Sequence, residues 1–284
     1  MPDNTPSTIQ DPKLSPSGPS PLGDPAWRPD LGALRARLDE IDNAVHDLLM
    51  ERAQVVENVA RSGKTAAFRP GREASILRRL VGRHSGQLPA QTLVRMWREM
   101  LAGTTAMQAP INVAVYDPSL SRAVTAMARE HFGVLTQTLE HPSVEAALGA
   151  VRSGDAAVAV LSFPLTEATW HSLLNGTPRL YVVARLPFWI SRRDHVPYAD
   201  AVAVASAAPD ASGAASGGAS GAASGGDHSF ITAPPQGING DMKLIADHGT
   251  ILEVEGWIDA SNPRLPAGAK FLGGYAIPMG GDTT

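Results

Sequence analysis

The longest helical pattern in this chain constrains its fold more than any other feature. From Leu31 to about Ser62 there is no proline and no strand pattern, with only Gly32 near the start. This stretch predicts one helix of roughly 30 residues, about 45 Å long. Its apolar residues recur at spacings of three and four, which is a heptad seam. The seam consists of Leu31, Leu34, Leu38, Ile41, Val45, Leu48, Val55 and Val59.

A helix of this length cannot bury its apolar stripe against two short neighbouring helices alone. A second copy of the chain is therefore the expected partner, and we predict a homodimer.

One position of the seam is charged, because Arg52 stands between Leu48 and Val55. A long cationic side chain can extend its head into water, so Arg52 is compatible with a plain helix surface. Alternatively, it points into an enclosed space and meets an anion, since an unpaired buried charge is very costly.

Arg35 lies on the same predicted helix, about 25 Å from Arg52 and about 100° away around the axis. One small anion cannot contact both within a chain. If two copies packed antiparallel, Arg35 of one could face Arg52 of the other. A dianion site would then form between the copies.

Two shorter helices follow. The first begins at the FRPGRE sequence, which contains Arg72 and Glu73, and a carboxylate in a first turn is also ordinary helix-dipole chemistry. The second begins near Pro89, and its apolar stripe continues with Thr104 and Gln108, which could equally be a frayed helix end. Together with Lys64, these residues supply cations, one carboxylate, one hydroxyl and one amide to one interior.

Composition narrows the chemistry. The 284 residues include no cysteine, so thiolate nucleophiles, disulfides and cysteine-ligated metals are excluded. The eight histidines show no closely spaced ligand pair, and we expect no metal and no cofactor. A net charge of -4 argues against a nucleic-acid partner. What remains suits a reaction that needs a held substrate shape and placed charges.

The sequences ALRARLDEIDNAVHDLLMERAQVVENVARSGK, RPGREASILRRL and LVRMWREMLAGTTAMQ resemble the all-helical, dimeric chorismate mutases that occur alone or fused to prephenate dehydratase. The resemblance implies an intertwined dimer that converts chorismate to prephenate by a Claisen rearrangement without a cofactor. By motif, Arg35 and Arg52 would bind the two substrate carboxylates, one of them from the partner chain.

The resemblance also implies roles for the other residues. Arg72 would support the carboxylate network, and Thr104 would line the carboxylate pocket. Glu73 would accept a hydrogen bond from the ring hydroxyl, and Gln108 would donate to the ether oxygen. In the family, a lysine of the first helix reaches the ether oxygen. Its position matches Gly63 here, so we assign this contact to the adjacent Lys64.

A further departure is Arg69, which stands where the family often has an acid.

The fold class expected is therefore α+β multidomain, with an all-α three-helix mutase domain followed by an α/β region. Residues 1–28 are rich in Pro and Ser and predict a disordered tail, and 29–109 are the mutase domain. Short apolar runs separated by helical stretches predict an α/β domain over 110–204. An Ala/Gly/Ser linker is expected over 205–226, followed by a β-rich segment over 227–284.

The α/β domain faintly resembles prephenate dehydratase, and the last segment resembles an amino-acid-sensing ACT domain. The dehydratase Thr-Arg-Phe triplet is missing, because the nearest sequence is Thr177-Pro178-Arg179-Leu180. We therefore expect no dehydratase activity. An aromatic amino acid effector, a docked pathway enzyme or a degenerate domain that only stabilises the dimer all remain open for this half.

The strongest alternative from another class is a non-catalytic dimeric helical module with an amino-acid-sensing or partner-binding C-terminal region. The seam and an arginine-rich patch favour it; Arg52, Thr104 and Gln108 oppose it. That patch consists of Arg69, Arg72, Arg78, Arg79 and Arg83. With no signal-peptide or membrane-span pattern, we expect a cytoplasmic protein that does not bind membranes.

Overall fold

The computed structural model describes residues 30–62, 68–119, 121–165, 170–190, 200–213, 226–232 and 242–280. The chain divides into two units, Met1–Gln54 and Val55–Thr284. The expected N-terminal tail and most of the expected Ala/Gly/Ser linker lie outside the described residues.

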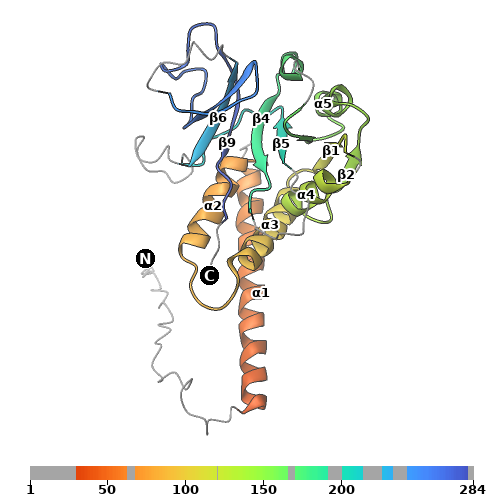
Figure 1. The fold of residues 1–284 in the computed structure, drawn as a ribbon. Coiled ribbons are helices and arrows are strands. Elements are labelled where there is room, and N and C mark those ends of the chain that lie inside the picture. Colours follow the sequence, from red (N-terminus) through yellow and green to blue (C-terminus); the bar gives the residue numbers. More distant parts are fainter. Residues whose placement is uncertain are drawn as a thin grey trace, which may run out of the picture. The chain divides into compact units, whose positions relative to one another are not determined.

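The first three elements along the chain are helices, as the sequence predicts (Figure 1). They are α1 (Leu31–Arg61), α2 (Pro70–Gly82) and α3 (Ala90–Ala106). Proline at the start of α2 suits a helix, because its ring fixes a helical φ and the first turn needs no N–H donor.

Helix α1 exposes its apolar seam in the single chain. None of its residues is buried, and its eight apolar seam side chains, from Leu31 to Val59, are between 42% and 64% exposed. Isolated exposed leucines are ordinary, but a continuous apolar stripe along one helix marks an interaction surface.

The remaining elements form an α/β region, which confirms the expected fold class. The expected helices near 121–131 and 143–152 are α4 (Ala123–Phe132) and α5 (Val144–Ser153). The expected strands are β1 (Asn112–Tyr116), β3 (Val158–Ser162), β4 (Tyr181–Leu186), β8 (Ile251–Glu255) and β9 (Lys270–Ala276).

Five elements were not anticipated from the pattern: β2 (Gln137–Glu140), η1 (Trp170–Leu174), β5 (Ala201–Ala205), β6 (Asp227–Thr232) and β7 (Leu244–Asp247). Strands β2 and β7 are mostly exposed edge strands, so they carry no apolar alternation that would reveal them. Strand β5 merges in sequence with the Ala-rich stretch that follows it.

Among the described residues, nine strands form one sheet in the order β2-β1-β3-β5-β4-β9-β6-β8-β7. Strands from the 110–204 and 227–284 segments therefore share one sheet. They join where β4 runs parallel to β9, with Val182 opposite Gly273. A Cβ at Gly273 would lie 2.0 Å from the Val182 carbonyl oxygen, and φ there is +145°, so this junction requires glycine.

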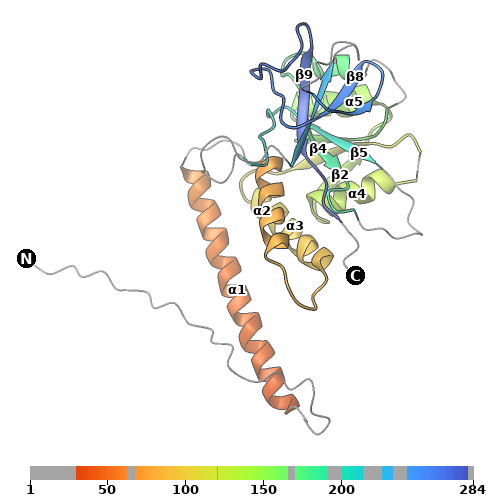
Figure 2. The same cartoon turned by 60° about the vertical axis from the view of Figure 1, so that its left-hand side comes forward.

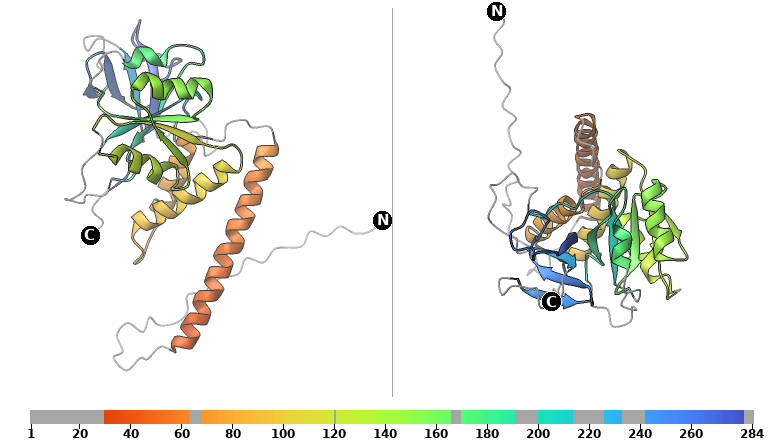
Figure 3. Two further views of the ribbon diagram at one scale, coloured as in Figure 1. Left: turned by 90° about the vertical axis from the view of Figure 1, so that its right-hand side faces the viewer. Right: turned by 90° about the horizontal axis from the view of Figure 1, so that it is seen from above.

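Helices cover both faces of the β1–β5 part of the sheet. Helix α5 packs with η1 on one face, where Leu148 and Leu174 meet Leu161, and α4 packs on the other, where Phe132 joins Val113 and Val158. The left view of Figure 3 shows the strands fanning out between these two green helices.

Helices α2 and α3 lie beside each other and contact the C-terminal region (Figure 2). Ala74 and Leu77 of α2 and Val94 of α3 form a buried cluster with Phe188, which follows β4. Helices α2 and α3 are thus part of the same packed unit as the sheet.

Candidate active site

The residues expected to form the site fall into three groups. Arg35 and Arg52 lie on α1 within the first unit, where Arg35 is exposed and Arg52 half-buried. Lys64 lies outside the described residues. The other four belong to the second unit: Arg72 and Glu73 in the first turn of α2, Thr104 in the last turn of α3, and Gln108 just beyond it.

Glu73 has a partner that the sequence did not reveal. Its Oε2 accepts a hydrogen bond from Nη1 of Arg98 on α3 at 2.9 Å, and the two side chains are 14% and 5% exposed. The guanidinium carbon of Arg98 lies 4.7 Å from the centre of the Phe188 ring. This is a largely buried ion pair covered by an aromatic ring.

Burial and charge act against each other on these two groups. Burial raises the pKa of Glu73 above its usual 4.5, the Arg98 charge counters this rise, and Asp210 adds to it. Burial lowers the pKa of Arg98 to about 10, against the effect of Glu73. Arg98 therefore stays charged at neutral pH, and it is the group that favours the ionised form of Glu73.

Sequence reasoning missed Arg98 because it followed the apolar residues of α3, which are Leu93, Met96, Trp97, Met100 and Leu101. Of these, Leu101 alone is buried in the single chain, and Met96 is exposed. The buried face is one residue further around the helix and consists of Ala90, Val94, Arg98, Leu101 and Thr105. The signal was present, since Val94, Arg98, Leu101 and Thr105 also recur at spacings of three and four.

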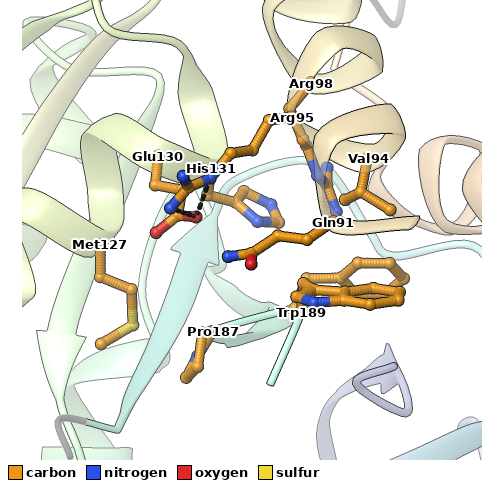
Figure 4. Close-up of a pocket in the computed structure, with 10 residues that line it drawn as sticks. Gln91, Val94, Arg95, Arg98, Met127, Glu130, His131, Pro187 and Trp189 are labelled. Carbon is orange, nitrogen blue, oxygen red and sulfur yellow. Dashed lines mark hydrogen bonds and ion pairs between the residues drawn. The ribbon is translucent and has the colours of Figure 1, made fainter. Parts of the chain in front are cut away.

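A small cavity of about 30 Å³ adjoins Arg98 (Figure 4). At one edge Arg95 binds Glu130 of α4 at 3.0 Å. Beside them His131 is buried, and its Nε2 has no hydrogen-bond partner among the described residues. Burial, and secondly the Arg98 charge, lower the pKa of His131 well below 6.5, so its ring is neutral. The cavity is lined by Gln91, Val94, Arg95, Arg98, Met127, Glu130, His131, Pro187, Phe188 and Trp189.

Thr104 and Gln108 lie together, as their spacing predicts. The Thr104 hydroxyl donates to the carbonyls of Met100 at 2.9 Å and Leu101 at 3.1 Å. The Gln108 side-chain amide donates weakly, at 3.4 Å, to the Thr104 carbonyl. A bond this long leaves the amide ready to turn toward a better acceptor.

Two arginines of the arginine-rich patch bind the C-terminal region. Arg69 pairs with Asp210 at 2.8 Å. Arg78 donates to the carbonyls of Ile277, at 2.9 Å, and Gly226, and to the Ser212 hydroxyl. These contacts explain part of the patch without nucleic acid.

The close fit of α2 also depends on Gly71. A Cβ at this position would lie 2.1 Å from the Asp210 carbonyl oxygen. Ser212, within the expected linker, is buried, and its backbone N–H donates to Asp227. Asp210 and Ser212, which follow β5, are therefore packed against α2.

In the sequence nearest to the dehydratase triplet, the Arg179 side chain is bound to the sheet. The Arg179 guanidinium donates to the Phe271 carbonyl at 2.6 Å and lies 5.1 Å from the Tyr181 ring centre. Both interactions hold this side chain against β9 and β4.

A second polar cluster surrounds Glu253 on β8. Tyr275 donates to this carboxylate, His248 lies 3.4 Å from it and Arg185 lies 3.7 Å from it. Burial acts to raise the pKa of Glu253, but the His228 hydrogen bond and the Arg185 charge outweigh burial and leave the pKa below 4.5. The cluster borders a cavity of about 190 Å³.

Nδ1 of His228 lies 3.1 Å from the Tyr275 hydroxyl and 3.6 Å from the Glu253 carboxylate. The cluster is thus an ionised carboxylate held by several donors.

The N-terminal helices match a known family over residues 34–109, described as chorismate mutase type II. This segment is a chorismate mutase type II domain. The match covers α2, α3 and nearly all of α1, and it contains each of the seven residues expected to form the site.

Curated relatives match somewhat more than a third of the chain. They include the bifunctional chorismate mutase/prephenate dehydratases of Stutzerimonas stutzeri, 35% identical over 112 residues, and Neisseria gonorrhoeae, 32% identical over 112 residues. The matches cover 36% and 39% of this chain and only 30% and 31% of those relatives. The chain thus spans about a third of the length of the curated relatives it matches.

Solved structures resemble the chain weakly. Prephenate dehydratase from Streptococcus mutans has a TM-score of 0.35 at 14% identity, covering 60% of this chain and 100% of that one. A structure described as a novel type of quorum quenching acylase has a TM-score of 0.35 at 17% identity, covering 58% and 94%. TM-scores this low do not establish a shared fold.

The described residues lack two further features. They contain no helix that is both long and apolar enough to cross a membrane. They also contain no group of three or more histidine or carboxylate side chains placed to hold a metal ion.

Proposed function

We propose that this protein is a chorismate mutase that converts chorismate to prephenate. The observation that carries the proposal is the type II match over 34–109, because it encloses the whole expected set of charged and polar residues. The curated relatives bear both mutase and dehydratase in their names, and the identity to them supports the mutase half.

In the proposed reaction the substrate's ether C–O bond breaks while a C–C bond forms within the same molecule. No proton or electron has to come from the protein, so catalysis consists of holding a compact shape and stabilising developing charge. Arg35 and Arg52 bind the two carboxylates, with Arg72 and Thr104 in support. Lys64 and Gln108 donate to the ether oxygen, and Glu73 accepts from the ring hydroxyl.

We further propose that two chains form the site. The exposed apolar seam of α1 supports this, because a second copy would remove it from water. The two arginines stand too far apart on one helix for a single dianion, as their spacing indicates. An antiparallel pairing of α1 helices supplies one arginine from each chain.

For the C-terminal region we propose regulation rather than dehydratase chemistry. The position of Arg179, bound to the Phe271 carbonyl, supports the absence of dehydration at Thr177-Leu180. The effector proposed is an aromatic amino acid. Mutase kinetics that stay unchanged with added phenylalanine, tyrosine and tryptophan would remove the regulatory proposal. Phenylpyruvate formed from prephenate by the protein, without acid, would remove the proposal that dehydratase activity is absent.

The deciding experiment follows chorismate absorbance after addition of the full-length protein, with prephenate identified by its acid conversion to phenylpyruvate. We expect turnover well above the uncatalysed rate. Absence of turnover would favour the alternative, a dimeric helical module that binds an amino acid or a protein.

A further inference from the structure

We infer that Arg98, covered by Phe188 of the C-terminal region, is a positioning residue that holds Glu73 as an ionised hydrogen-bond acceptor for the mutase reaction. The inference rests on the proposed function, in which Glu73 accepts from the substrate hydroxyl. It makes the C-terminal region part of the catalytic apparatus.

The contact geometry is the first step of the argument. Arg98 Nη1 donates to Oε2 of Glu73 at 2.9 Å, which fixes one carboxylate oxygen. We assign the other oxygen, Oε1, to the substrate hydroxyl. A charge-assisted bond to one oxygen also fixes the plane of the carboxylate, so the direction of Oε1 is set before substrate binds.

The environment of Glu73 is the second step. Two further titratable groups face Glu73 and Arg98: Asp210 from the stretch after β5, and His131 from α4. Asp210 is itself paired with Arg69. His131 is neutral, so Arg98 is the cation that offsets both the burial of Glu73 and the charge of Asp210. Without it, the pKa of Glu73 would rise further, and the protonated carboxyl is a weaker acceptor than the carboxylate.

The origin of the cover over Arg98 is the third step. Phe188 follows β4, and its ring lies 4.7 Å from the Arg98 guanidinium carbon. The same ring packs with Leu77 and Val94 of the mutase helices. A shift of the segment after β4 would loosen Arg98 and with it the orientation of Glu73, so the C-terminal region can act on the mutase site through this contact.

The test is the pH dependence of kcat/KM for chorismate in the full-length protein. We expect an acid limb that reports protonation of Glu73. In Arg98→Met the limb should move to higher pH by about 1 to 3 units, the range that a close opposite charge accounts for. In Phe188→Leu it should move the same way by less. Arg98→Lys should restore most of the wild-type limb, because the charge is kept.

The matched control is Arg95→Gln. Arg95 lies on the same helix, borders the same cavity and pairs with Glu130 at 3.0 Å, but it does not bind Glu73. Its limb should stay at the wild-type pH. A merely structural role of Arg98 would lower turnover at every pH without moving the limb.

A direct readout keeps the inference testable without turnover. The Glu73 carboxyl can be titrated by carbon-13 NMR, with Glu73→Gln to assign its resonance. Its pKa should rise in Arg98→Met and in Phe188→Leu, including the case in which only the milder variant folds.

An unmoved carboxyl pKa and acid limb in a folded Arg98→Met protein, or an equal shift in Arg95→Gln, would overturn the inference. An inactive wild-type protein whose Glu73 nonetheless titrates as expected would overturn the proposed function and the catalytic part of the inference, and leave only the coupling of the pair.

Discussion

Helix α1 and the helix pair α2–α3 differ in how far one chain completes their packing. Helix α1 has an apolar seam with no buried residue, whereas α2 buries Ala74 and Leu77, and α3 buries Val94 and Leu101. All three belong to the same type II domain. One chain therefore supplies a core for two of the helices from its own C-terminal sheet, and the proposed second chain supplies the core for the third.

The charged residues follow the same division. Arg98 and Glu73, on α3 and α2, are already paired within the chain. Arg35 and Arg52, on α1, are the residues proposed to meet a ligand that only a dimer can enclose. If the proposed roles hold, the C-terminal region organises the acceptor end of the site, and association of two chains organises the carboxylate-binding end.

The largest effect expected comes from breaking the α1 seam. The double substitution Leu38→Glu with Val45→Glu places charges on its apolar face, so we expect monomers and complete loss of turnover, measured by sedimentation and chorismate decay. The control Ala36→Glu with Asn43→Glu, at exposed positions of α1 outside the seam and with the same spacing, should preserve both. A fully active monomer would show that the site does not need a second chain.

The next effect is on chemistry alone. Arg52→Ala should lower kcat/KM by about 100-fold to 1,000-fold, the scale of one donor lost from a preorganised site, because a substrate carboxylate loses its charged partner; the dimer should stay intact. Arg37→Ala is the control, because Arg37 lies on the same helix and pairs at the surface with Glu40. Normal turnover in Arg52→Ala would sink the assignment of the site.

A smaller effect tests the docking of α2. Arg78→Met should lower the free energy of unfolding by about 1 to 3 kcal/mol, because the half-buried carbonyl groups of Gly226 and Ile277 each lose a charged donor. Arg79→Met, at the exposed neighbouring position, should change it by less than about 0.5 kcal/mol. Equal effects in urea unfolding would show that α2 is held by other contacts.

The smallest effect is a pH dependence. His131 is neutral in the folded chain because its pKa lies well below 6.5, whereas in the unfolded chain it binds a proton as pH falls through 6.5. Stability from this group is therefore present above pH 6.5 and lost below it, by about 1.4 kcal/mol per pH unit. Between pH 6.5 and 5.5, the free energy of unfolding should fall by about 1 kcal/mol less in His131→Gln than in wild type, while His46→Gln, exposed on α1, should follow wild type.

Several elements could be predicted because their cause is local. The length of α1, the start of α2 at Pro70 and the strands β1, β3 and β4 follow from periodicity, proline and short apolar runs. The edge strands β2 and β7 could not be found this way, because solvent covers them and no apolar alternation is needed. Thr104 and Gln108 were placed together by helical spacing, as in the structure, whereas Arg98 was not singled out.

By itself, the sequence determined that residues 31–108 have helical periodicity, that an arginine interrupts their first seam and that they resemble a chorismate mutase, since helix formation and motif spacing are properties of neighbouring residues. Only the tertiary structure decided that Glu73 is buried beside Arg98, that Phe188 covers this pair and that both C-terminal segments share one sheet. Burial and pairing between residues far apart in the chain depend on which surfaces pack together, and periodicity along one segment does not carry that information.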